Sequence, residues 1–266
     1  MKQLKLMVLT LTLLMGTMFT SCMDSGESGP QQWAGVVKVN DRMGYVTFTD
    51  AAGTELIPTN TIPVTLNARM AYIYCQVDEG QDLSTNPKSI KITLLADPTG
   101  IDATAITTSK VESSDVTTNA PVGSLSFASG YSTVAPFQFS ENTIVLPVLY
   151  RVKNVTTTED IKNELAKHTF TLVCYTDDIK SGDTILKLYL RYKVEDEPAA
   201  IAERATRTSS FKAYEISQIL REYTLKSGQA KPAKITIVAQ QNEYNNKLED
   251  TSTIEKVYEI EYKTAE

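Results

Sequence analysis

Residues 185–192 read ILKLYLRY, and their pattern indicates how the C-terminal half of the chain folds. Leucine occupies every second position from Leu186 to Leu190, whereas Lys187 and Arg191 lie on the opposite face of an extended strand. Strict alternation of this kind is typical of a sheet that buries one face and hydrates the other. The stretch therefore predicts an antiparallel β-sandwich of the immunoglobulin-like (Ig-like) kind.

The neighbouring segments carry similar signals. Residues 142–152 are apolar on both faces, as in a strand that is buried on two sides. In residues 256–262, two tyrosines and an isoleucine share a face opposite two glutamates. The strands predicted in this half are 142–152, 169–175, 185–192, 210–216, 234–240 and 256–262.

Two segments of this half predict helix instead. In residues 158–168, Ile161 and Leu165 recur at helical spacing, and Thr158 precedes two acidic residues, which suits an N-cap with acids in the first turn. Residues 217–223 predict one or two helical turns between strands.

A second strand set lies nearer the N-terminus. It comprises residues 33–39, 45–49, 54–58, 70–77 and 89–96. Five short strands separated by Gly and Asp turns favour a small Greek-key barrel such as the OB-fold. Residues 97–121 interrupt this rhythm with many Ser and Thr, two prolines and no aromatic residue, which is typical of a domain boundary. We therefore predict an all-β chain with an OB-like barrel at 33–110 and a β-sandwich at 111–266.

Composition excludes several classes of protein. The chain has 266 residues, 42% of them hydrophobic, and a net charge of −6, which is too apolar and too weakly charged for a wholly disordered protein. Three cysteines are too few for a disulfide scaffold. The acidic balance argues against a nucleic-acid partner.

The first residues predict a processed leader. Residues 1–21 contain two lysines and then an apolar run that is too short to span a bilayer. The run ends in Thr20-Ser21-Cys22, and small residues directly before a cysteine resemble the lipobox of bacterial lipoproteins. That resemblance implies cleavage before Cys22 and lipid attachment to it, which would hold the domains that follow on a membrane. The alternative is an ordinary signal peptide with a chance cysteine.

Residues 22–32 predict a flexible tether, because they contain two glycines and a proline and no large aliphatic run. Acidic residues after a lipid cysteine resemble surface-export signals of some Gram-negative lipoproteins. Here only Asp24 and Glu27 are present, so both faces of the outer membrane stay open as locations.

Signals for catalysis are weak. The sequence has no Gly-x-Ser-x-Gly, no phosphate-cradling glycine loop and no Cys-x-x-Cys. His168 is the only histidine, and it is interpreted as a helix C-terminal residue that the helix dipole favours, with a metal ligand or general base as the alternative. Cys75 and Cys174 share strand faces with apolar residues, which predicts small core side chains rather than reactive thiols. We predict no catalytic residue, no metal site and no cofactor.

Three carboxylates surround a turn, namely Asp177, Asp178 and Asp183. Acidic side chains on one loop could hold calcium, but their spacing does not fit an EF-hand, and a solvated hairpin tip is the simpler interpretation. The triplet Asp183-Thr184-Ile185 resembles a short O-glycosylation acceptor of secreted proteins, which leaves glycosylation of Thr184 as a hypothesis.

Three aromatic residues of the barrel segment, Trp33, Tyr72 and Tyr74, have two interpretations. They could stack on a base or a sugar, or they could pack as strand residues of the barrel. The barrel segment carries no basic groove, so we predict no nucleic-acid partner.

The order of several segments resembles the NigD-like lipoproteins. These segments are the lipobox, a Trp-led strand at 33–37, YVTF at 45–48, DAAGT at 50–54, HTFTLV at 168–173, LKLYLRY at 186–192 and SFKAYEIS at 210–217. The resemblance implies an N-terminal OB domain, a C-terminal β-sandwich and no assigned enzymatic activity. Two departures are the thin acidic cluster after Cys22 and Leu190-Arg191-Tyr192, where Leu-Arg-His is usual.

These observations together predict a lipid-anchored, non-enzymatic protein of the bacterial outer membrane. It would bind or scaffold an envelope protein or a glycan, and its membrane contact would be the lipid at Cys22. Two alternatives stay open. One is a fimbrial or pilus-type lipoprotein that donates a terminal strand within 256–262, and the other is an envelope glycan hydrolase.

Overall fold

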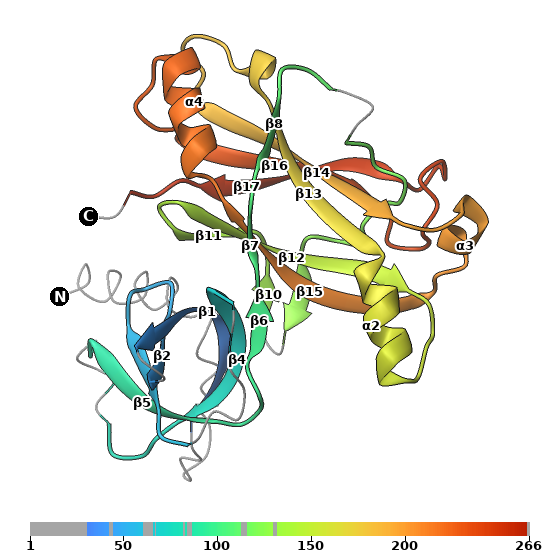
Figure 1. Ribbon diagram of the computed structural model, residues 1–266. Coiled ribbons are helices and arrows are strands. Elements are labelled where there is room, and N and C mark those ends of the chain that lie inside the picture. Colours follow the sequence, from blue (N-terminus) through green and yellow to red (C-terminus); the bar gives the residue numbers. More distant parts are fainter. Residues whose placement is uncertain are drawn as a thin grey trace, which may run out of the picture. The chain divides into compact units, whose positions relative to one another are not determined.

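The computed structural model describes residues 31–42, 45–60, 66, 68–81, 83, 87–112, 116–129 and 132–264. The chain divides into two compact units. The first comprises Met1–Ala103 and Ala128–Val134, and the second comprises Thr104–Phe127 and Ala135–Glu266. Strands dominate both units, so the predicted all-β class is confirmed (Figure 1).

The first unit is a closed five-stranded barrel. Its strands pair in the order β1-β2-β3-β5-β4, and β1 also pairs with β4. Neighbours are antiparallel except β3 and β5, which are parallel. This order is that of the OB-type barrel expected from the sequence. The strands are β1 (Gln32–Arg42), β2 (Tyr45–Thr49), β3 (Glu55–Pro58), β4 (Met70–Val77) and β5 (Ser89–Leu94), with β6 (Thr99–Ile101) added beside β4.

Alternation along these strands fills the barrel. In β5, Ile90, Ile92 and Leu94 are buried in the barrel core, while Ser89 and Lys91 are exposed. The same core takes in Trp33, Val37, Phe48, Leu56, Ala71, Ile73, Cys75 and Val77.

The second unit is a sandwich of two sheets. One sheet has the order β11-β12-β15-β7, and the other has the order β17-β16-β14-β13-β8. The strands of the first are β7 (Ala103–Ala105), β11 (Phe137–Ser140), β12 (Thr143–Val152) and β15 (Thr206–Glu215). Those of the second are β8 (Thr107–Ser109), β13 (His168–Tyr175), β14 (Ile185–Val194), β16 (Lys234–Gln241) and β17 (Ile254–Glu261). The strands β9 (Phe127–Ser129) and β10 (Ser132–Val134) pair with each other as a separate two-stranded sheet, and most of its residues belong to the first unit.

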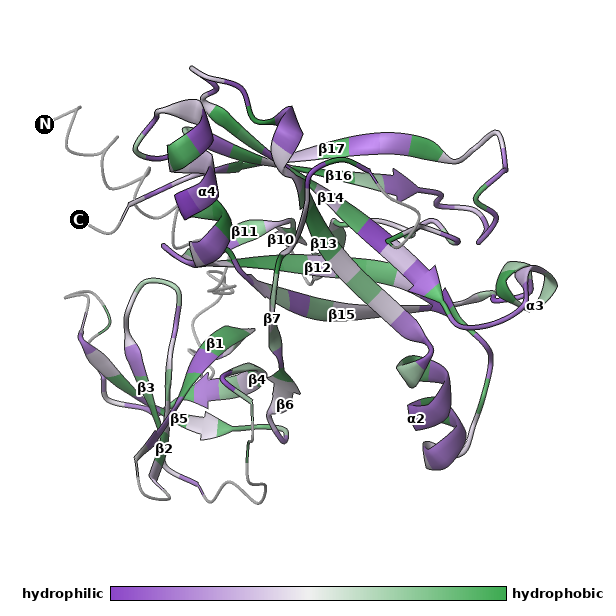
Figure 2. Cartoon of the chain, turned by 45° about the horizontal axis from the view of Figure 1, so that its top comes forward, coloured by the Kyte–Doolittle hydropathy of each residue, from purple (hydrophilic) through white to green (hydrophobic). Residues whose placement is uncertain are grey.

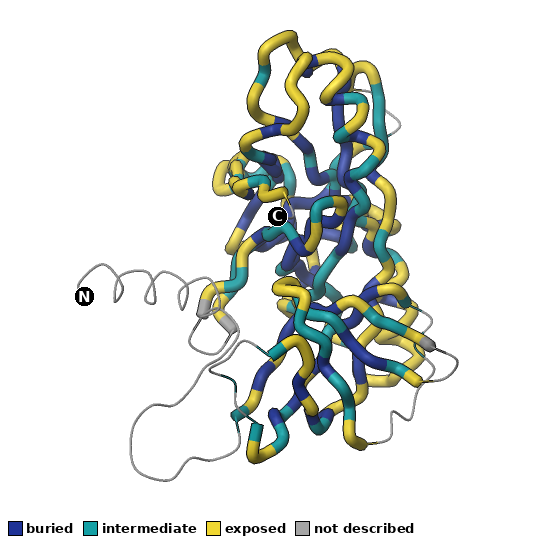
Figure 3. Tube along the Cα trace, turned by 90° about the vertical axis from the view of Figure 1, so that its left-hand side faces the viewer, coloured by how far each residue is buried: buried dark blue, intermediate teal, exposed yellow. Residues whose placement is uncertain are grey.

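One hydrophobic core joins the two sheets. It includes Ile144 and Leu146 of β12 together with Leu186 and Leu188 of β14. Hydrophobic and hydrophilic residues alternate along β14 as its sequence predicts (Figure 2), and buried and exposed residues alternate along much of the chain trace (Figure 3). The expectation that β12 is buried on both faces is also confirmed, because eight of its ten residues are buried.

The second sheet differs from the prediction in one respect. It is mixed rather than purely antiparallel, because β14 runs parallel to β16 and β13 runs parallel to β8. Between β14 and β16 the chain crosses to the other sheet as β15 and then forms α4 (Ser217–Ser227), so it returns in its original direction. Alternation within one strand cannot reveal this, since it depends on which sheet the next strand joins.

Two further helices connect strands of the sandwich, α2 (Thr158–Ala166) and α3 (Pro198–Ala202). The N-cap of α2 is Thr157 rather than the predicted Thr158, and its hydroxyl accepts a hydrogen bond from the backbone N–H of Asp160. The predicted turns at 217–223 form part of an eleven-residue helix, α4, which ends at Gly228 in the left-handed conformation.

The predicted domain boundary at residue 110 stays a prediction. The segments β7 and β8 lie before it in sequence, and in the structure they pair with strands of the second unit.

In the described part of the chain, no helix combines the length and apolar character that crossing a membrane requires.

Candidate functional site

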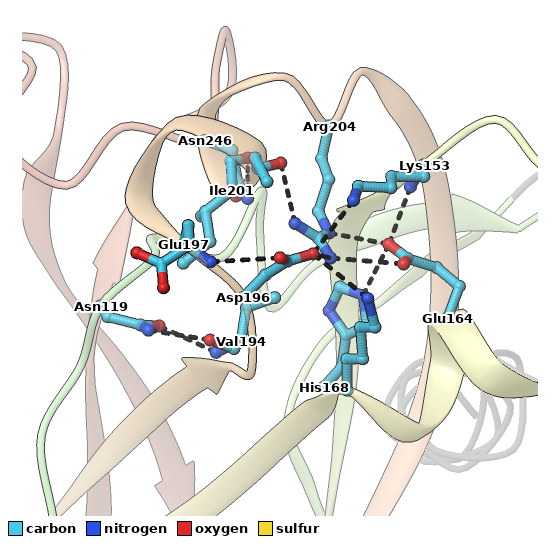
Figure 4. Close-up of polar contacts among 12 residues, drawn as sticks. Asn119, Lys153, Glu164, His168, Val194, Asp196, Glu197, Ile201, Arg204 and Asn246 are labelled. Carbon is cyan, nitrogen blue, oxygen red and sulfur yellow. Dashed lines mark hydrogen bonds and ion pairs between the residues drawn. The ribbon is translucent and has the colours of Figure 1, made fainter.

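A buried ionic cluster joins α2, β13 and the segment around α3 (Figure 4). Its members are Glu164, His168, Asp196 and Arg204, with Tyr192, Lys153 and Lys167 at its margin. The side chain of Arg204 is 0% exposed and that of Glu164 is 5% exposed. Buried charged groups are uncommon unless they are paired. The hydrogen-bond partners of each group therefore show whether any of them is available for chemistry.

Local sequence positions these groups. Glu164 is on the last full turn of α2, and His168 follows four residues later, so both project to the same side of the chain. Pro198 opens α3 at its first turn, where its missing N–H costs nothing, and Arg204 follows the C-cap residue Glu203. The short helix therefore ends where Arg204 turns inward.

Arg204 lies between two carboxylates. Its Nε donates to Glu164 Oε1 at 2.7 Å, and its Nη2 donates to Glu164 Oε2 at 3.3 Å. The same Nη2 donates to Asp196 Oδ2 at 3.1 Å, and Nη1 donates to the carbonyl oxygen of Ala200 at 2.9 Å. This forked geometry satisfies the guanidinium and fixes both acids.

His168 contacts the same carboxylate. Its Nε2 lies 3.3 Å from Glu164 Oε1, and its Nδ1 lies 2.6 Å from the Tyr192 hydroxyl. Burial lowers the pKa of His168 and outweighs the opposing effect of Glu164. Burial would by itself raise the pKa of Glu164, but hydrogen bonds from the Lys153 N–H and from Arg204 outweigh it and hold that pKa below its usual range. The cluster therefore contains a neutral imidazole beside an ionised carboxylate.

Asp196 forms the outer edge of the cluster. Its Oδ2 accepts from Lys153 Nζ at 3.0 Å and from Lys167 Nζ at 3.2 Å, in addition to Arg204. These three hydrogen bonds hold the pKa of Asp196 far below its usual range. The acids and the bases are thus bound to one another, an arrangement that fixes α2 and α3 to the sandwich rather than leaving a group free to react.

His168 corrects one interpretation from the sequence. It is the first residue of β13, buried and neutral, rather than a charged residue that the helix dipole favours. The structure supplies two partners for it, Glu164 and Tyr192. The spacing of Glu164 and His168 could have revealed the first contact, but no local signal points to Arg204, which is 40 residues from Glu164 in sequence.

The two cysteines in the described residues are core residues, as predicted. Cys75 and Cys174 are buried and free. Burial, with a smaller effect of nearby acids, raises the pKa of each thiol to about 12. Neither thiol is therefore poised as a nucleophile. Cys22, the predicted lipidation site, lies outside the described residues.

The three carboxylates of the acidic turn have separate partners. Asp177 pairs with Lys226 at 3.1 Å, and Asp178 accepts from the Tyr189 hydroxyl at 3.0 Å. Asp183 accepts from the backbone N–H of Lys180 at 2.7 Å. In the described residues, no group of three or more acidic, histidine or cysteine side chains has a geometry suited to a metal ion. Thr184, the hypothetical glycosylation site, is exposed just before β14.

The structure separates the three aromatic residues of the barrel. Trp33 is 5% exposed and packs in the barrel core, so it cannot stack on a base or a sugar. Tyr74 is 39% exposed and Tyr72 is half-buried, both on β4. The packing interpretation therefore holds for Trp33.

Known structures resemble this chain. A "putative lipoprotein" from Bacteroides fragilis NCTC 9343 is 93% identical, and the match covers 89% of this chain and 100% of that chain with a TM-score of 0.81. A protein of unknown function, DUF1344, from Bacteroides vulgatus ATCC 8482 is 12% identical over 87% of this chain and 91% of its own, with a TM-score of 0.55. A NigD-like immunity protein from Bacteroides caccae ATCC 43185 is 11% identical over 87% and 94%, with a TM-score of 0.48. No protein-family model matches the chain, and no curated protein matches it significantly.

Proposed function

Since the chain belongs to the same family as the Bacteroides fragilis protein, which is described as a "putative lipoprotein", we propose that it is a NigD-like, lipid-anchored, non-enzymatic protein of the cell envelope that binds or scaffolds a partner. The observation that carries this proposal is the 93% identity to a protein described as a "putative lipoprotein", and the leader predicted at residues 1–21, directly before Cys22, supports it. The buried ionic cluster is compatible with a non-enzymatic role, because its charged groups are bound to one another.

The anchor is proposed to be Cys22, after removal of residues 1–21. The test is metabolic labelling with an alkyne fatty acid in a Gram-negative host that processes lipoproteins. We expect the native chain to take up the label and to sediment with membranes, and Cys22→Ser to lose both properties. Ser25→Ala, in the tether, is the matched control and keeps both. A native chain that stays unlabelled would overturn the anchor.

The location is proposed to be the outer membrane, on either its periplasmic or its external face. Density separation of the two membranes tests the first part, and protease treatment of intact cells tests the second. Recovery of the lipidated chain with the inner membrane would contradict the proposal.

The fimbrial alternative has less support. A donated strand has to leave its own sheet, yet β17 pairs with β16 along eight residues, and Tyr262 donates through its hydroxyl to the carbonyl oxygen of Glu141. SDS-resistant polymers in native envelope extracts would nevertheless favour it.

The hydrolase alternative requires two carboxyl groups with room between them for a sugar. Glu164 and Asp196 are instead both engaged by the buried Arg204. Release of reducing sugar ends from envelope glycans by the purified chain would support the hydrolase alternative.

The proposed partner itself is best sought by crosslinking the lipidated protein in its own envelope.

A further inference from the structure

Two arginines lie directly opposite each other on the sandwich. Arg151 of β12 and Arg207 of β15 are register partners in an antiparallel pair, so their side chains leave the same face of the sheet. Val148 and Tyr150 of β12 belong to the sandwich core, which places Arg151 on the opposite face. Like charges in this relation repel each other, so the pairing calls for an explanation.

Both guanidinium groups converge on one oxygen atom. Arg151 Nη2 donates to the main-chain carbonyl of Glu243 at 2.5 Å, and Arg207 Nη2 donates to the same carbonyl at 2.7 Å. The Glu243 carboxylate is held elsewhere, because it accepts from Gln241 Nε2 at 3.0 Å. In the part of the chain that the structure describes, no carboxylate forms an ion pair with either arginine. A neutral carbonyl therefore holds two positive charges together without compensating them.

The two arginines differ in their access to solvent. Arg151 is 5% exposed, whereas Arg207 is exposed. Burial lowers the pKa of Arg151, and the charge of Arg207 lowers it further. A partly desolvated positive pair attracts an anion more strongly than either arginine would in water, and the exposed Arg207 gives the anion a route of approach.

We propose that Arg151 and Arg207 form a binding site for a small oxyanion, a carboxylate or phosphate group, that bridges the two guanidiniums. The planar donor fork of arginine matches both kinds of group. Such an oxyanion could be free inorganic phosphate or the acid group of a sugar. The inference goes beyond the proposed function and does not depend on the lipid anchor.

The test is calorimetric titration of the purified protein, with the same detergent present throughout. Inorganic phosphate and sodium glucuronate are titrated separately, with sodium chloride at equal ionic strength as the reference. We expect at least one oxyanion to bind above the chloride reference, and the one that binds identifies the source. Arg207→Gln should weaken that binding by roughly tenfold or more, since a charge-assisted hydrogen bond is lost.

Arg221→Gln is the matched control, because it removes the same charge from an exposed position on α4. It should leave the affinity unchanged. Arg207→Lys keeps the charge but not the fork, and it should recover only part of the binding. Failure of both oxyanions to bind above chloride would overturn the site. Equal binding by native protein and Arg207→Gln, or an equal loss in Arg221→Gln, would overturn it as well.

A purely structural role for the pair predicts a different result. Arg207 would then only hold the segment that follows β16, and Arg207→Gln would lower the thermal unfolding midpoint with no oxyanion present. Added oxyanion would raise the midpoint of the native chain no more than that of the variant, and that outcome contradicts the proposal. Preferential stabilisation of the native chain supports it.

Discussion

At the scale of single residues, the buried Arg204 makes stability depend on the acidic residues that pair with it. Glu164→Gln leaves the guanidinium buried without its main counter-charge, and a broken buried pair costs about 3–5 kcal/mol in the free energy of unfolding. Urea unfolding measures the loss. Glu259→Gln is the control, because its pair with Lys234 is exposed, and losing that pair should lower stability far less. Equal losses in the two variants would show that Arg204 does not depend on Glu164.

The only histidine gives the cluster a pH dependence. Burial holds the pKa of His168 below the ordinary value of 6.5. The unfolded chain therefore binds a proton in the window just below that value while the folded chain does not, so the free energy of unfolding falls as the pH is lowered through it. We expect His168→Gln to remove this slope between about pH 7 and pH 5, measured by urea unfolding at each pH. A slope that persists in the variant would place its origin elsewhere.

A side chain's place could be predicted from the sequence where it depends on neighbouring residues, and not where it depends on residues far away in the chain. Alternation placed Cys75 and Cys174 in the cores, because a strand fixes each side chain by its parity. Arg204 could not be predicted, since Glu164 is 40 residues away in sequence and Asp196 meets it across the intervening helix α3. Position within a strand is local information, whereas an ion pair across 40 residues is not.

At the scale of elements, the N-cap Thr157 stabilises α2, the helix that carries Glu164. The Thr157 hydroxyl accepts from the Asp160 N–H at 3.1 Å, which satisfies one of the free donors at the helix start. Thr157→Ala should therefore cost about 1 kcal/mol in urea unfolding. Thr158→Ala, one residue inside the helix, should change stability much less. A reversed order would mean that Thr158 is the cap, as the sequence suggested.

Strands with strong alternation were predictable, and short ones were not. The bounds of β2 and β4 agree with the prediction, because aromatic and β-branched residues fill them. The four-residue β11 and the hairpin of β9 and β10 were missed, since three or four residues are too few to establish a period. Such strands form because a neighbouring edge offers them backbone partners.

At the scale of the whole molecule, the closure of the barrel depends on contacts that no local pattern contains. Pairing of β1 with both β2 and β4 turns the sheet into a ring. The sequence favoured this outcome only through the number and shortness of the strands. In the sandwich, the mixed order of the second sheet likewise arises from the crossover through β15 and α4. Connectivity between sheets is therefore the part of the fold that the sequence leaves open.

The two units have separate hydrophobic cores, and this predicts two unfolding transitions. Ile73 lies in the barrel core and Leu188 in the sandwich core, each fully buried. Replacing either by alanine should cost about 2–5 kcal/mol in its own unit. Trp33 is the only tryptophan and is buried in the barrel, so its fluorescence reports the barrel, while far-ultraviolet circular dichroism reports both units.

We expect Ile73→Ala to shift the fluorescence transition to lower urea and to leave the other transition in place. Leu188→Ala should do the reverse, because each cavity weakens only the core that contains it. The predicted boundary near residue 110 would then separate two units that unfold independently. A single transition in which fluorescence and circular dichroism coincide for both variants would show instead that the two cores unfold as one cooperative unit.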